Sequence, residues 1–158
     1  MLLTDIVLII ALLGFIGAGT KDGFVHTLGR LIGAVVGFLF AKAWFLSLAS
    51  IFGLILPLSW ARVVAFLLIF LFINRLVGML FKLVDGAFSI LSILPFLKSI
   101  NALLGGILGF VEGVVLLGGA IYLILTFSLE PHLVQWLSLS SVAHWIRWTF
   151  QLVLGFLL

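Results

Sequence analysis

The chain has 158 residues, of which 65% are hydrophobic and only 8% are charged. Soluble globular domains are about half apolar and about one quarter charged, so this composition indicates an integral membrane protein. The net charge of +3 comes from eight Lys and Arg residues spread along the chain, without the basic patch that binds nucleic acid. The chain contains no cysteine, and its three histidines lack metal-ligand spacing, so we expect neither a metal nor a cofactor.

Four long apolar runs are the expected membrane spans, at residues 2–19, 29–49, 63–81 and 102–127. A helix needs about 20 apolar residues to cross a bilayer, and these runs are continuous where the strands of a barrel would alternate. The first run carries Asp5 and lacks the basic leading region of a signal peptide, so we expect it to be retained. The sequence therefore predicts an all-α, polytopic membrane protein with a four-helix transmembrane domain at residues 1–127.

Two further segments are apolar but do not fit these spans. Residues 86–97 are too short to cross and contain Pro95, which favours an interfacial or re-entrant segment. Residues 128–158 are expected to form an outer-side loop and an amphipathic helix capped by Ser140 and lying on the membrane surface. A fifth span is the alternative for this helix. Its expected interfacial anchors are Trp136, Trp145, Arg147 and Trp148.

The distribution of basic residues near the helix ends predicts an orientation. One side, with loops 20–28 and 82–101, holds four of them, and the other side holds two. The positive-inside rule then places both loops in the cytoplasm and both termini outside. The residues counted are Lys21, Arg30, Lys82 and Lys98 on the first side, and Arg62 and Arg147 on the second.

Glycines recur every fourth residue in two of the expected spans. Small residues at this spacing allow two helix backbones to approach closely. Packing within the chain is one interpretation of these ladders, and an interface between copies of the chain is the other. The ladders consist of Gly29, Gly33 and Gly37 in the second span and of Gly105, Gly109 and Gly113 in the fourth.

Three charged residues lie inside the expected spans: Lys42, Arg75 and Glu112. Glu112 shares a helix face with the glycine ladder, so it should point into the bundle. An unpaired charge facing lipid would cost at least ~2.5 kcal/mol, so we expect Glu112 to be paired. Lys42 is the first expected partner because its estimated depth is similar, and Arg75 is the second.

Several short motifs occur in an order that resembles the colicin V production protein family. They are Asp5 at the start of a span, the segment "KDGFVHTLGRLIG" with Gly23 and Phe24, and Asn101 followed by the ladder from Gly105. The resemblance covers nearly the whole chain. The family usually has a basic residue at the position of Glu112, so this glutamate is a departure from its pattern.

The resemblance implies a bacterial inner-membrane protein that supports the production or export of a peptide toxin (a bacteriocin) and envelope homeostasis. A non-enzymatic accessory protein that binds other membrane proteins, or a second copy of itself, is the favoured function. A small oligomeric channel or transporter, with Lys42, Arg75 and Glu112 in its pathway, is the alternative. The sequence contains no G-x-S-x-G, H-E-x-x-H or P-loop motif, so we do not expect an enzyme.

Overall fold

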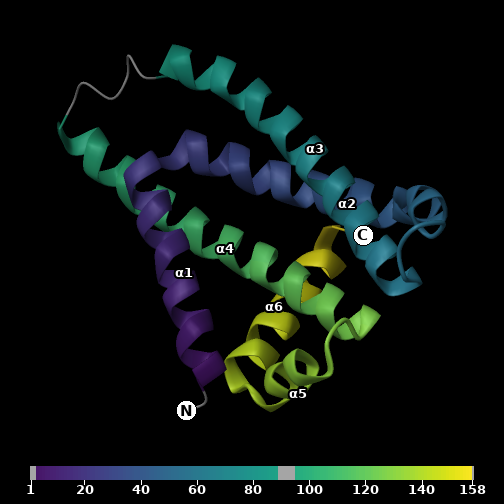
Figure 1. Ribbon diagram of the computed structural model, residues 1–158. Helices are drawn as coiled ribbons and strands as arrows, with labels where there is room; N and C mark the ends of the chain where they lie inside the picture. The colour runs from purple at the N-terminus through teal and green to yellow at the C-terminus, as the bar shows by residue number, and fades with distance from the viewer. Residues whose placement is uncertain (1–2, 89–94, 158) are drawn as a thin grey trace.

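The computed structural model describes residues 3–88 and 95–157, and helices joined by short turns make up this part of the chain (Figure 1). Helices α1 to α4 are long and apolar enough to cross a membrane. The predicted all-α class with four membrane-spanning helices is therefore confirmed. The helices are α1 (Leu3–Asp22), α2 (Phe24–Phe52), α3 (Leu58–Phe88), α4 (Pro95–Phe127), α5 (Pro131–Leu139) and α6 (Ser141–Leu157).

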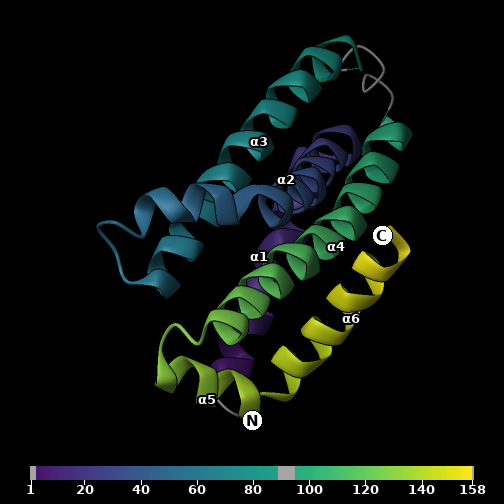
Figure 2. The same ribbon diagram turned by 90° about the vertical axis from the view of Figure 1, so that its right-hand side faces the viewer.

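The four long helices form two antiparallel pairs, α2 with α3 and α1 with α4 (Figures 1 and 2). Helices α2 and α4 join the pairs and run in the same direction. Phe38 of α2 lies at the centre of the region where the pairs join. Its ring packs edge-to-face against Phe66 of α3 and Phe150 of α6, with ring centroids 5.4 and 5.2 Å away. Edge-to-face packing brings the positive ring edge to the negative face, and such pairs add about 0.5–1.5 kcal/mol beyond burial. One core cluster therefore lies where α2, α3, α4 and α6 meet, and a second lies between α1, α4 and α6.

The turn between α1 and α2 is a single residue, Gly23, with φ 82° and ψ 179°. Glycine adopts this positive φ without the strain that a Cβ would bring. The expected loop at residues 20–28 is thus mostly helix, since α1 continues to Asp22 and α2 begins at Phe24. Our estimate of where the second span begins, residue 29, was five residues too late because it counted apolar residues and ignored the glycine.

The C-terminal helix α6 starts beside the N-terminus and α5 and then runs back along α4 (Figure 2). Ala143, Ile146 and Phe150 form its buried face, and the Phe150 side chain lies directly over Gly118 of α4. The expectation of a helix lying flat on the outer surface is therefore corrected. The apolar face of α6 packs into a groove of α4 at Gly118, where the missing side chain allows close contact. The polar face of α6 lies on the side away from this groove.

The segment before α6 also contains a helix that the sequence analysis treated as loop. Helix α5 begins at Pro131, and the Glu130 side chain accepts a hydrogen bond from the Leu133 N–H at 3.1 Å. Both features are typical of a helix N-terminus. Ser140 does cap α6 as predicted, because its Oγ accepts from the Ala143 N–H at 3.0 Å.

Half of the proposed interfacial or re-entrant segment at residues 86–97 falls outside the described residues. Residues 86–88 are the last of α3 and residues 95–97 the first of α4, while residues 89–94 are not described. The tryptophans proposed as anchors, Trp136, Trp145 and Trp148, are all exposed on α5 and α6.

Candidate functional site: an ion-paired cluster between α2 and α4

Glu112 lies in the middle of α4 and is only 4% exposed. Its carboxylate Oε2 accepts two hydrogen bonds from Arg30 of α2, from Nε at 3.2 Å and from Nη2 at 2.9 Å. The expectation that Glu112 is paired is met, but the expected partners were wrong. Arg30 takes the place that we assigned first to Lys42 and then to Arg75.

Arg30 also binds Asp22, at the end of α1, through Nη1. One guanidinium therefore connects three helices, with a carboxylate on each side of it. A planar guanidinium with five N–H groups suits this role, whereas the ammonium of lysine would not span two carboxylates in fixed directions. The cluster ties the corner between α1 and α2 to the middle of α4.

Arg30 belongs to a stripe of α2 that faces α4. The stripe comprises Thr27, Arg30, Ala34, Phe38 and Ala41, whose spacing of three and four residues places them on one side of a helix. All except Arg30 are buried, and Phe38 contacts Gly119 of α4. This spacing of three and four residues is the sequence feature that identifies Arg30 as the partner of Glu112. Treating Arg30 only as a charge at a helix end leaves this spacing out.

Depth along the helices explains why the estimate failed. The Phe24 N–H donates to Oδ1 of Asn101 at 2.9 Å, so the start of α2 is level with Asn101 of α4. Arg30 is then ~9 Å and Glu112 ~16 Å from that level at 1.5 Å per residue. The long arginine side chain covers this difference. On the same scale Lys42 is ~27 Å from that level, so its depth matches that of Glu112 less well than the depth of Arg30 does. The estimate that favoured Lys42 counted from Arg30, six residues inside the helix, and not from Phe24.

Asn101 holds the α1–α2 corner in place. Besides accepting from Phe24, its side chain packs against Gly23 where a Cβ would have to stand. Phe24 N–H is one of the first donors of α2, which have no partner within the helix, so Asn101 caps α2 from another helix. The structure thus brings together three of the motif residues from distant parts of the sequence.

The two glycine ladders face different partners, both within the chain. Gly29, Gly33 and Gly37 of α2 lie against α3, where a Cβ would meet Phe81, Asn74 and Phe70. The ladder of α4 lies against α1: a Cβ on Gly105 or Gly109 would collide with the carbonyl of Gly19 or Phe15, and one on Gly113 would meet the Phe15 side chain. Backbone-to-backbone approach of this kind is closest between α1 and α4.

The comparisons with known proteins agree with this arrangement of motifs. The family described as Colicin V production protein matches residues 4–149, nearly the whole chain. This chain belongs to the colicin V production protein family. Comparison with curated proteins and with solved structures gives no match. The predicted family membership is confirmed by a match that includes the corner, the glycine ladders and Glu112.

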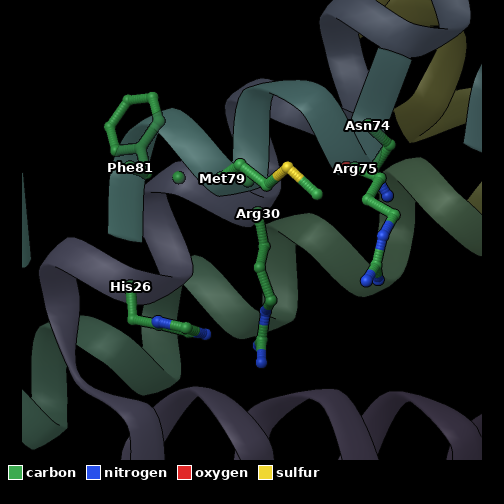
Figure 3. A pocket seen from close by; sticks show the side chains of 8 residues that line it. His26, Arg30, Asn74, Arg75, Met79 and Phe81 are labelled. Atoms are coloured by element: carbon green, nitrogen blue, oxygen red, sulfur yellow. The ribbon is translucent and has the colours of Figure 1, made fainter. Parts of the chain in front are cut away.

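The other two intramembrane charges of this colicin V production family protein are not drawn into the cluster. Lys42 is exposed on α2 and forms no bond with the described residues. Arg75 is exposed on α3 and lines a cavity together with Arg30 (Figure 3). The three charges that we grouped as one potential pathway therefore have three different environments.

A second buried polar contact lies at the opposite end of the molecule. Asp5 of α1 is 5% exposed, and its Oδ1 accepts from the Ser140 hydroxyl at 2.6 Å and from the Val142 N–H at 3.2 Å. An acidic group at a helix N-terminus is favourable because the helix dipole is positive there. Asp5 therefore fixes the start of α6 beside α1, a role that the sequence analysis did not assign to it.

The Arg30 cluster is an ion pair extended to a second carboxylate. Glu112 accepts from two N–H groups of Arg30, and Asp22 accepts from a third. Among the described residues, no three His, Cys, Asp or Glu side chains are arranged to hold a metal ion. The geometry of the cluster is suited to holding α1, α2 and α4 in fixed positions relative to one another.

Proposed function

We propose that this protein is a non-enzymatic accessory protein of the bacterial inner membrane that supports toxin production or export and envelope homeostasis. The observation that carries the proposal is the pairing of Glu112 with Arg30, which places the buried carboxylate in a contact between helices. Family membership supports the toxin-related part of the proposal. We further propose that the glycine ladders serve to hold α1 against α4 and α2 against α3.

The accessory role requires a surface for other membrane proteins or for a second copy of the chain. Exposed apolar side chains cover the side of α3 that faces away from α2, and they fit either a lipid or a protein neighbour. We propose that the loop at the α1–α2 corner faces the cytoplasm and that both termini face outward. The excess of basic residues near that end supports this orientation.

The channel function remains the second candidate because Arg75 is an exposed charge within a candidate span. Intramembrane charges without a protein partner are a common feature of ion pathways. The separate environments of Lys42, Arg75 and Glu112 favour the accessory function over a pathway shared by all three.

Two measurements distinguish these functions. In a toxin-producing host from which the gene is deleted, we expect the intact chain to restore toxin release, measured by growth inhibition of a sensitive strain. Purified protein in liposomes should show no ion flux above empty liposomes. Flux that disappears in Arg75→Gln or Lys42→Gln would support the channel instead, and unchanged toxin release in the deletion strain would contradict the accessory role.

A further inference from the structure

A cavity of about 270 Å³ lies between α2 and α3, on the side of Arg30 that faces α3. Its polar lining consists of His26 and Arg30 from α2 and Asn74 and Arg75 from α3. Figure 3 shows Arg30 and Arg75 extending their guanidinium groups in the same direction, with His26 on the other side of Arg30. No carboxylate lines this cavity.

The two arginines of the cavity differ in their counter-charges. The two nearby carboxylates, Asp22 and Glu112, are both bound to Arg30, and they take up three of its N–H groups. A guanidinium has five, so Arg30 retains donors for a second acceptor. Arg75 forms no bond with a carboxylate among the residues whose side chains are described. A cation within an apolar span needs such a partner, because leaving it unpaired there is costly.

The surroundings of the cavity are apolar. Leu76, Met79 and Leu80 on the neighbouring turns of α3 are all exposed, as expected of a surface that contacts lipid. Gly78 lines the cavity, and no atom lies within 4 Å of where its Cβ would stand, so the wall is open at this point. An anion that reaches Arg75 from this side would therefore be attached to an apolar molecule.

We propose that this cavity binds a phosphate group, and that the phosphate is the headgroup of an anionic membrane lipid. Arg75 is the principal contact, and Arg30 contributes the donors that its carboxylates leave unused. Guanidinium groups bind phosphate oxygens through paired N–H donors, and basic pockets between membrane helices bind anionic lipid headgroups in this way. The lipid would complete the charge balance of α3. This inference does not depend on the accessory role proposed above.

The test uses the purified full-length chain in an uncharged detergent, with lipid added by titration and the melting temperature as readout. The probes are dioleoylphosphatidylglycerol, dioleoylphosphatidylcholine as the lipid without net charge, and inorganic phosphate. We expect phosphatidylglycerol to raise the melting temperature more than phosphatidylcholine does. Arg75→Gln should weaken the apparent affinity for phosphatidylglycerol by roughly tenfold, as loss of a charged hydrogen-bond donor does.

Matched variants separate binding from folding. Lys42→Gln removes another exposed cation of a span but lies outside the cavity, so it should bind phosphatidylglycerol as the unchanged chain does. Gly78→Leu places a side chain in the open wall and should also weaken binding, while Gly14→Leu, at a glycine of α1 with equally open surroundings, should not.

Three results would overturn the proposal or its lipid part. Equal affinity of Arg75→Gln and Lys42→Gln for phosphatidylglycerol would overturn the site. An equal response to phosphatidylcholine, whose headgroup also carries a phosphate, would overturn the choice of an anionic lipid. If inorganic phosphate alone produces the full rise in melting temperature, and the rise requires Arg75, the phosphate site stands and the lipid as its carrier is rejected.

Discussion

Arg30 binds carboxylates from two other helices, α1 and α4. The two carboxylates differ in burial: the Asp22 side chain is 31% exposed and that of Glu112 is 6% exposed. Water can therefore replace Arg30 at Asp22 but not at Glu112. This difference determines what each substitution should do.

At the residue scale, we predict that Arg30→Gln destabilises the protein more than Glu112→Gln. Removal of Arg30 leaves the Glu112 charge buried without its partner, which should cost about 3 kcal/mol. Removal of the Glu112 charge leaves Arg30 paired with Asp22, and about 1 kcal/mol should be lost. Unfolding of the purified protein in detergent measures both values.

The double substitution provides the decisive comparison. If the ion pair forms, Arg30→Gln and Glu112→Gln together should be less destabilising than the sum of the two, by about 1–2 kcal/mol. Lys42→Gln combined with Glu112→Gln is the control, and its effects should add. Additive losses for the Arg30 pair, or coupling between Lys42 and Glu112, would contradict the observed contact.

At the scale of the helix, glycine determines how closely α1 and α4 approach. We predict that Gly109→Leu lowers stability by about 1–3 kcal/mol, because its side chain would be forced against the backbone carbonyl of Phe15. Gly14→Leu on α1 should have little effect, since no atom lies within 4 Å of its Cβ position. Thermal unfolding in detergent distinguishes the two variants.

The same pair of variants tests whether the ladder serves within the chain or between copies. A fall in cross-linked oligomer for Gly109→Leu, with an unchanged melting temperature, would show that α1 is not its important neighbour. Equal melting temperatures and equal cross-linking in Gly109→Leu and Gly14→Leu would contradict a packing role altogether.

Phe150 is the largest side chain that packs α6 against the bundle. Phe150 is fully buried and contacts Gly118 and Phe38, so Phe150→Ala should leave a cavity and cost about 3–5 kcal/mol. Trp148→Ala removes a larger ring that is 57% exposed and should change stability much less. If Trp148→Ala is as harmful as Phe150→Ala in thermal unfolding, α6 does not pack in this way.

At the scale of the whole molecule, the α1–α2 corner and the start of α4 lie at one end, and the turn between α2 and α3 lies at the other (Figure 1). We predict that the first end is cytoplasmic. Because the chain has no cysteine, Thr20→Cys and Ser59→Cys each introduce one exposed thiol at a known end. An impermeant thiol reagent added to intact cells should label Ser59→Cys only, and labelling of Thr20→Cys only would invert the orientation.

The family match and the four spans could be predicted because they depend on local properties of the sequence. Length and apolar composition determine whether a helix can cross a bilayer, whatever its neighbours are. The cap at Ser140 also follows from a single residue with a strong preference for helix N-termini. The corner at Gly23 was not predicted, because residues 20–28 were expected to form a loop. The position of Glu112 on the glycine face was read correctly from the helical period.

Only the tertiary structure decided which helices lie together and therefore which charges meet. A glycine ladder indicates close approach but does not name its partner, and the two ladders face α3 and α1. Glu112 pairs with Arg30 because the start of α2 lies beside Asn101 of α4. The arginine side chain is long enough to cover the remaining distance along the helices. Likewise, an amphipathic helix fits a membrane surface or a groove equally well by sequence, and Gly118 supplies the groove that α6 occupies.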